Sequence, residues 1–268
     1  GHSGAEIIKE GGNSNCLMGR VLDALLAETS VSFISLEGGL ADNAIPRQTD
    51  ARVIISVEEK EKGLAVLGGM EEKLQRELAV KDPGFRITVT EEGERTEDCL
   101  QEKCMQKAVC CLLSMPNGIQ AMSADVKGLV ETSLNLGMLE LSKDCLRLTY
   151  AVRSSLESGK AAVCRKLAAI SALAGAKVEI RGDYPGWAYR QDSPLRDKMI
   201  RVYEKMYGEK PRVEAIHAGL ECGLFSGKLP DLDCISYGPD MKGIHTTEEV
   251  LSIASVKRVW EYLLEVLR

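Results

Sequence analysis

Three histidines are the side chains in this sequence best suited to acid–base or metal chemistry, and each lies among glycines. They occur in residues 1–4 (GHSG), 217–223 (HAGLECG) and 243–245 (GIH). Glycines beside a histidine let the backbone approach a ligand and leave the ring accessible. His217 and His245 each follow a predicted strand, and loops beyond strand ends bind ligands in α/β sheets. Spacing alone leaves both a functional and a purely hydrogen-bonded role open for each ring.

Arg153 is the cation whose position is most informative. It follows an alternating run in which Leu148, Tyr150 and Val152 share one parity. If Val152 faces the core, Arg153 faces the other side of the sheet. A guanidinium in such a place can hold a carboxylate through two hydrogen bonds, although an exposed surface arginine explains the pattern equally well. Residues 43–47 (NAIPR) are typical of a turn between strands.

The composition argues against several classes of protein. The 268 residues carry 34 Lys plus Arg and 40 Asp plus Glu, a net charge of −6, whereas nucleic-acid binders usually show a basic stripe. No apolar run reaches the roughly 18 residues of a membrane span, and no signal peptide is visible. We therefore expect no nucleic-acid partner and no membrane partner. The sequence also lacks GxSxG, GxGxxG and P-loop motifs.

The nine cysteines form no CxxC pair and no zinc-ribbon spacing. This usage predicts reduced cytoplasmic thiols that serve as small core residues. The alternative is a cysteine hydrolase based on Cys222 and His217, which share one loop.

The elements that must position these residues repeat one order, which is helix, strand, strand, helix, strand. The first set is predicted at 13–29, 31–37, 51–57, 60–80 and 85–90, and the second at 98–114, 130–141, 145–154, 158–174 and 178–181. Residues 13–90 and 96–181 therefore resemble two ferredoxin-like αββαβ halves.

A break rich in Gly, Pro and aromatic residues at 182–187 indicates a domain crossing. Beyond it we predict helices at 195–207 and 247–267 and strands at 213–216 and 234–237. This is too little for a complete α/β domain, and we interpret it as the tail of a larger one. The expected fold class is α+β followed by part of an α/β domain.

Seven motifs in order make the sequence resemble a known family. They are residues 1–4 (GHSG), 43–47 (NAIPR), 131–135 (ETSLN), 153–155 (RSS), 184–187 (YPGW), 217–223 (HAGLECG) and 243–245 (GIH). Together they look like the aminoacyl-histidine (Xaa-His) dipeptidases, within the di-zinc family of carnosinases, aminoacylases and glutamate carboxypeptidases. The resemblance covers essentially the whole chain. The HAGLECG and PGW segments are fairly specific to the dipeptidase group, while GHSG and NAIPR are shared more widely.

The resemblance implies that residues 1–183 are a lid and dimerisation domain and that 184–268 are the C-terminal portion of a zinc-peptidase catalytic domain. His245 matches a zinc ligand, and His2 matches the lid histidine that polarises the scissile carbonyl, often in the partner subunit's site. Asn43 matches a residue that contacts substrate. Arg153 matches the arginine that holds the substrate's terminal carboxylate, and Gly219 matches a glycine whose backbone faces the substrate. Glu221 and His217 receive no role.

The sequence also departs from the family, because its His-x-Asp motif, bridging Asp and catalytic Glu-Glu pair are missing. The pairs at 58–59, 71–72 and 91–92 are predicted to be solvated charges. One histidine cannot hold zinc tightly, since a site needs three or four protein ligands. The chain also starts with Gly1. We therefore expect a fragment, inactive alone, of a cytoplasmic homodimeric enzyme that uses two zinc ions, or cobalt or manganese, to hydrolyse dipeptides.

Two alternatives remain open from the sequence. One is a non-catalytic dimerisation or ligand-binding module, which would have no reason to keep His2, Arg153 and His245 together. The other is a different member of the same family, such as a tripeptidase or an aminoacylase.

Overall fold

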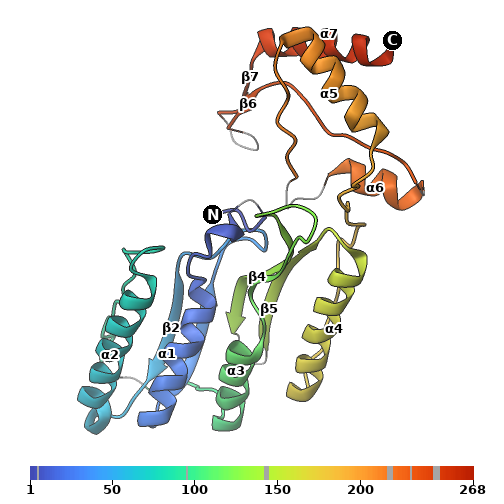
Figure 1. The fold of residues 1–268 in the computed structure, drawn as a ribbon. Coiled ribbons are helices and arrows are strands. Elements are labelled where there is room, and N and C mark those ends of the chain that lie inside the picture. Colours follow the sequence, from blue (N-terminus) through green and yellow to red (C-terminus); the bar gives the residue numbers. More distant parts are fainter. Residues whose placement is uncertain (5, 95, 142–144, 216–219, 230, 244–247) are drawn as a thin grey trace. The chain divides into compact units, whose positions relative to one another are not determined.

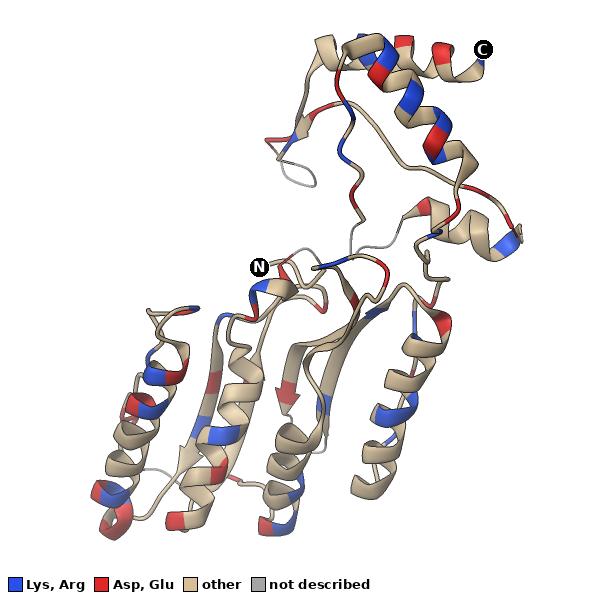
Figure 2. Ribbon diagram, in the orientation of Figure 1, with Lys and Arg blue, Asp and Glu red and all other residues tan. Residues whose placement is uncertain are grey.

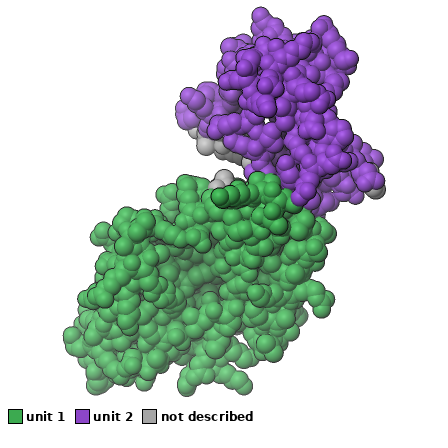
Figure 3. Space-filling model, in the orientation of Figure 1, with its two compact units in different colours: residues 1–182 green, residues 183–268 purple. Residues whose placement is uncertain are grey.

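A computed structural model describes the chain except for residues 5, 95, 142–144, 216–219, 230 and 244–247 (Figure 1). The chain divides into unit 1, Gly1–Gly182, and unit 2, Asp183–Arg268 (Figure 3). Three of the residues singled out above, His217, Gly219 and His245, lie outside the described residues.

The sheet of unit 1 is antiparallel throughout. β1 (Ser32–Gly38) pairs with β2 (Thr49–Ile54) on one side and with the last residues of β4 (Val130–Leu141) on the other. β3 (Gly118–Met122) pairs with the first residues of β4, and β5 (Leu146–Ser154) runs along β4 from Thr132 to Leu141. Since β5 occupies one edge of β4, β1 and β3 share its other edge and leave a gap between them.

Helices cover one face of this sheet in the order α2, α1, α3, α4 (Figure 1). Their bounds are Ser14–Glu28 for α1, Lys60–Leu78 for α2, Glu102–Ser114 for α3 and Glu157–Ala174 for α4. Two 3-10 turns, η1 (Ile7–Lys9) and η2 (Val57–Glu59), accompany them. The main core lies between the helices and the sheet, and its fully buried members include Leu22, Phe33, Leu36, Leu136 and Leu139.

The central strand β4 contains a bulge at Gly137. The pairing with β5 shifts between Leu136 and Met138, so the core-facing residues change from even numbers (Leu134, Leu136) to odd ones (Leu139, Leu141). A Cβ on Gly137 would lie 2.3 Å from the carbonyl oxygen of Asp42. The bulge therefore brings the loop after β1 directly against the β4 backbone.

Unit 2 is built on the packing of α5 (Pro194–Tyr207) against α7 (Ile253–Leu267). Met199, Tyr262 and Val266 form its buried cluster, and the hydroxyl of Tyr262 donates to the Met199 carbonyl at 2.7 Å. Its other elements are α6 (Glu221–Lys228), β6 (Met241–Lys242) and β7 (Val250–Leu251).

The other face of α7 carries an uncovered apolar stripe. It consists of Ile253, Val256, Trp260, Leu264 and Leu267, spaced three or four residues apart, and all five are exposed. Ile253 and Leu267 are 86% and 72% exposed. Stripes of this kind in soluble proteins usually mark a surface that another chain segment covers.

The expected last strand of each αββαβ half is absent. Residues 85–90 and 178–181 belong to no strand. Residues 85–90 instead lie against α2, where Glu71 accepts from the Ile87 N–H at 2.9 Å and Gln75 donates to the Phe85 carbonyl at 3.2 Å. Phe85 packs beside Leu74. The alternating pattern is real, but side chains of α2 rather than a neighbouring strand bind the Ile87 N–H and the Phe85 carbonyl.

Unit 2 also differs from the prediction. Residues 213–215 and 234–237 belong to no strand, and the terminal helix begins at Ile253 rather than at 247. Conversely, β3 and α6 were not predicted from the sequence. Glycine permits the docking of α6, since a Cβ on Gly223 or Gly227 would lie 2.8 or 2.6 Å from Pro185.

The cysteines are less buried than expected. Cys99, Cys104, Cys110 and Cys145 are exposed, and only Cys111 of the nine is buried. Cys110 and Cys111 are neighbours on α3, so a helical turn directs one outward and the other inward. The prediction that these thiols serve as core residues is wrong for the four exposed ones, whereas Cys111 is buried and Cys16 packs against the main core. Burial does raise the pKa of the half-buried Cys16 thiol to about 12.

No helix within the described ranges is both long enough and apolar enough to cross a membrane. Basic and acidic residues are interspersed along the helices of both units (Figure 2).

Substituting Gly137 tests the close approach of β4 to the loop after β1. Gly137→Ala places a methyl group against the Asp42 backbone, which cannot rotate away, so we expect the chain to lose about 1–3 kcal/mol of stability. The control is Gly68→Ala on α2, where nothing lies within 4 Å and alanine should add about 0.5–1 kcal/mol. Urea unfolding measures both, and equal midpoints for the two variants would contradict the packing described here.

Candidate functional site

The N-terminal segment is bound to the loop that carries Asn43. His2 and Ala44 form an antiparallel β-bridge. The Ser3 N–H donates to the Asn43 carbonyl at 2.9 Å, and the Ile45 N–H donates to the Gly1 carbonyl at 2.8 Å. The structure therefore brings together His2 and Asn43, two of the predicted site residues that are far apart in the sequence.

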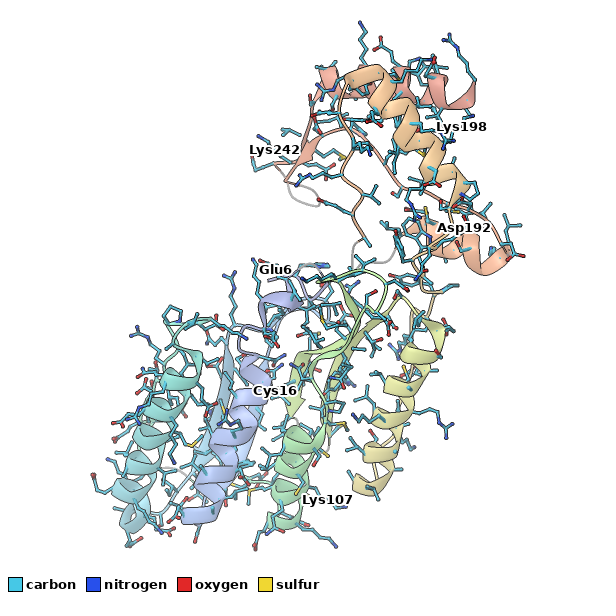
Figure 4. The ribbon with its side chains drawn as sticks, viewed as in Figure 1. Glu6, Cys16, Lys107, Asp192, Lys198 and Lys242 are labelled. Atoms are coloured by element: carbon cyan, nitrogen blue, oxygen red, sulfur yellow. The ribbon has the colours of Figure 1, made fainter. Side chains whose placement is uncertain are left out.

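The His2 ring is oriented by its own turn. The N–H of Gly4 donates to Nδ1 of His2 at 3.1 Å, and the backbone N–H of His2 donates to Glu6 at 2.9 Å. Because Nδ1 accepts, a neutral ring carries its proton on Nε2. Glu6, which Figure 4 labels beside this segment, also bonds Lys9, and that contact lowers the pKa of its carboxyl group. A donor at Nε2 is the chemistry that stabilises a developing oxyanion.

Asn135 on β4 holds the Asn43 loop from the opposite side. Its side chain is 1% exposed, and Nδ2 donates to the carbonyls of Asp42 and Ala44 at 3.0 and 2.8 Å. Its Oδ1 accepts from Nδ2 of Asn13 at 3.1 Å. Both ends of the amide are engaged, so the network fixes which end faces the loop.

Four asparagines, Asn13, Asn15, Asn117 and Asn135, form a cluster that we call the asparagine node. It fills the gap between β1 and β3 on the edge of β4. The Leu136 carbonyl accepts from Asn13 and Asn15 at 3.1 and 3.2 Å, while the Leu136 N–H donates to Asn117 at 2.8 Å. Asn13 also accepts from the Cys16 N–H and so caps the start of α1.

Arg153 lies on β5 directly opposite Ser133 of β4. Opposed residues point to the same face of an antiparallel sheet, and this face is the one opposite Leu134 and Val152, which pack against α4. Among the described residues, Arg153 makes no hydrogen bond or ion pair, and its Nε is buried without a partner. A half-buried guanidinium in that state is suited to an anionic ligand.

Asn135 shares that sheet face, two residues along β4 from Ser133. The loop that Asn135 binds thus lies toward the same face as Arg153, although no direct contact joins Arg153 to His2 or Asn43. A cavity of about 250 Å³ adjoins the node and is lined by Glu10, Asn13, Ile45, Asn117 and Asn135, among others. His2, Asn43 and Arg153 do not line it.

The described residues contain no group of three or more His, Cys, Asp or Glu that could hold a metal ion. His245, the residue matched to a zinc ligand, and Gly219 fall outside the described ranges. Glu221 begins α6 rather than lying in a loop. The described residues alone therefore do not make a complete metal site.

Sequence reasoning missed most of the asparagine node. It placed Asn13 at the start of a predicted helix and Asn135 at the end of a motif, and it did not connect the four asparagines. The signal in the sequence was a polar residue, Asn135, in an otherwise apolar strand. Such a residue indicates a buried hydrogen bond but does not identify the residues that form it.

Arg153 offers a direct test in the isolated chain. We expect its Nε–H signal in an NMR spectrum to shift as an acetylated dipeptide with a free carboxylate is added, with a dissociation constant on the order of 1 mM. A carboxamide version of the peptide should cause no shift, because it lacks the anion. Arg147 is the matched control, since it lies on the same strand and already pairs with Glu140. Equal shifts at both arginines would rule out a dedicated carboxylate site.

The comparisons with known proteins agree with the motifs. Peptidase family M20/M25/M40 matches residues 18–268. The cytosol non-specific dipeptidase of Escherichia coli strain K12 is 34% identical over 268 residues, covering 100% of this chain and 55% of that protein. The crystal structure of aminoacylhistidine dipeptidase from Vibrio alginolyticus superposes with a TM-score of 0.92 at 34% identity, covering 100% of this chain and 54% of that one.

The chain spans about half the length of the relatives it matches. The expected mixed α/β class is confirmed by the structural match. With a family match over most of its residues, the chain belongs to peptidase family M20/M25/M40.

Proposed function

We propose that this chain is the lid and part of the catalytic domain of a metal-dependent dipeptidase that cleaves Xaa-His dipeptides. The observation that carries the proposal is the arrangement in unit 1. There a histidine with Nε2 as its donor is bound to the Asn43 loop, and an arginine without a partner lies on the same sheet. The relatives, whose names describe dipeptidases, support the reaction class.

Each lid residue has a distinct role in this proposal. Arg153 binds the terminal carboxylate of the dipeptide through a bidentate pair, which fixes the length of peptide accepted. His2 donates from Nε2 to the carbonyl oxygen as it becomes an oxyanion, in its own or a partner subunit's site. Asn43 contacts the bound substrate, and the backbone of Gly219 faces it.

The metal part of the proposal needs more ligands than the motifs of this sequence assign. Zinc, or cobalt or manganese in its place, would supply an activated water in the whole enzyme. His245 is the only ligand that the motifs assign here, and a single histidine does not hold zinc tightly. This stretch supplies substrate recognition and oxyanion stabilisation, and we propose that it is inactive alone.

The proposed assembly has support from exposed surfaces. The apolar stripe of α7 fits a catalytic half that is covered by further chain in the whole enzyme. For the lid, β2 and β5 end the sheet on either side, and open strand edges favour pairing with a second copy. The name of the Escherichia coli relative supports a cytosolic location.

An activity assay tests the proposal that this chain binds substrate but does not hydrolyse it alone. We expect the 268-residue chain to show no hydrolysis of Xaa-His dipeptides with or without added zinc, because the motifs assign it a single metal ligand, His245, and a zinc site needs three or four. A longer polypeptide that also carries the family's His-x-Asp and Glu-Glu motifs should hydrolyse them and lose activity to a chelator. Hydrolysis by the 268-residue chain itself would overturn the proposed role, and an inactive longer polypeptide would favour a non-catalytic binding module.

The carboxylate role of Arg153 is tested in the longer, active polypeptide. Arg153→Lys keeps the charge but loses the bidentate geometry, so KM should rise about 10–100-fold, which corresponds to about 1.4–2.7 kcal/mol. Arg147→Lys on the same strand and the same sheet face is the control and should leave KM unchanged. Steady-state kinetics measures both, and an unchanged KM in Arg153→Lys would remove Arg153 from the site.

A further inference from the structure

We propose that Asn135 is a positioning residue that holds Asn43 and His2 in one fixed arrangement. It does so by binding the two carbonyl groups that flank Asn43. The catalytic meaning of this inference rests on the proposed function, but the arrangement itself can be tested without any activity.

The orientation of the Asn135 amide is determined by its surroundings. Asn13 donates to its oxygen, and Asn13 is itself fixed because it caps α1 and donates to the Leu136 carbonyl. The Nδ2 group of Asn135 must therefore face the loop, where both of its hydrogens have carbonyl partners. With 1% of the residue exposed, water cannot replace these bonds if the loop moves away.

The Asn135 contacts reach His2 through one further layer of hydrogen bonds. Asp42 and Ala44, the two residues bound by Asn135, bracket Asn43, whose carbonyl binds the Ser3 N–H. Ala44 forms the β-bridge with His2. A displacement of residues 42–44 would therefore carry the Asn43 and His2 backbones with it.

Close backbone contacts restrict the loop of residues 42–44 to one position on β4. A Cβ on Gly137 would lie 2.3 Å from the Asp42 carbonyl oxygen, and one on Gly39 would lie 1.8 Å from the Gly137 carbonyl oxygen. Gly39 also has a φ of 79°, which favours glycine. The backbone of the loop thus contacts the backbone of β4 directly at Gly137. The two hydrogen bonds from the Asn135 amide then determine how far the loop lies from β4.

Asn15 shows that Asn135 has a special place even within the asparagine node. Asn15 is 0% exposed, donates to the carbonyls of Leu136 and Gly38, and accepts from Thr49. It makes no hydrogen bond to residues 42–45. Replacing Asn15 should lower the stability of the chain by removing a buried amide, as replacing Asn135 does. It should not release the Asn43 loop.

The experiment compares Asn135→Ala with Asn15→Ala in the 268-residue chain. We expect both to lower the urea midpoint. In Asn135→Ala, amide hydrogen exchange at Ser3 and Ile45, the two N–H groups that join the N-terminus to the loop, should accelerate at least tenfold beyond the change in global stability. In Asn15→Ala these two amides should follow global stability alone. Equal local acceleration in both variants, or none in Asn135→Ala, would overturn the proposal.

Asn135→Asp covers the case in which the alanine variant fails to fold. It keeps the shape and the acceptor for Asn13 but presents a carboxylate to two carbonyl oxygens. We expect the same local acceleration, together with a change in the His2 ring nitrogen shifts as the bond from Gly4 to Nδ1 loosens. Unchanged exchange and unchanged His2 shifts in a folded Asn135→Asp would overturn the proposal.

The kinetic arm separates this inference from the proposed function. In the longer, active polypeptide, Asn135→Asp should lower kcat at least tenfold while KM changes less than threefold, because Arg153 on β5 still binds the carboxylate. A fall in kcat equal to that of Asn15→Ala would count against Asn135 as a positioning residue. The exchange results stand even if the wild-type polypeptide proves not to be a dipeptidase.

Discussion

The interruption beside Leu136 is the constraint on which unit 1 depends. On this edge of β4, β1 and β3 leave a central backbone group without a neighbouring strand. A buried N–H or carbonyl left unsatisfied costs about 1–3 kcal/mol, so the gap requires other partners. Side-chain amides provide them, and each amide comes from the point where another element begins, namely α1 for Asn13 and Asn15 and β3 for Asn117. The hydrogen-bonding requirement of the Leu136 backbone is thereby met by residues at the start of α1 and of β3, and it fixes where this helix and this strand begin.

The same requirement connects the fold to chemistry. An amide can both accept and donate, so Asn135 accepts from Asn13 of the node and still has the capacity to donate to a loop. Asn135 uses that capacity on the loop of Asn43, and this loop in turn binds the segment of His2. Arg153 takes its place differently, from strand parity alone. The candidate site is thus defined by the sheet and its gap rather than by contacts among the functional side chains.

The hydrophobic periodicity of the sequence predicted the elements whose structure depends only on which residues of one segment are buried. The four helices of unit 1, strands β1, β2, β4 and β5, and the outward parity of Arg153 all follow from it. It failed where a partner decides the outcome. Residues 85–90 alternate as a strand does, but α2 satisfies their backbone with side chains, and β3 is short and exists because β4 offers an edge. The asparagine node was invisible for the same reason, since its bonds join residues distant in sequence.

The asparagine node also determines how the protein would age chemically. Asparagine side chains are thermolabile, and Asn117 precedes Gly118. Within the described residues, Asn117 uses only its oxygen in the node, as acceptor for Asn13 and Leu136. An aspartate formed there would accept the same two bonds. Loss of ammonia at Asn135 would instead remove both donors to the loop. Conversion of Asn117 to a normal aspartate therefore leaves the hydrogen bonds of the node in place, whereas the same conversion at Asn135 would release the Asn43 loop.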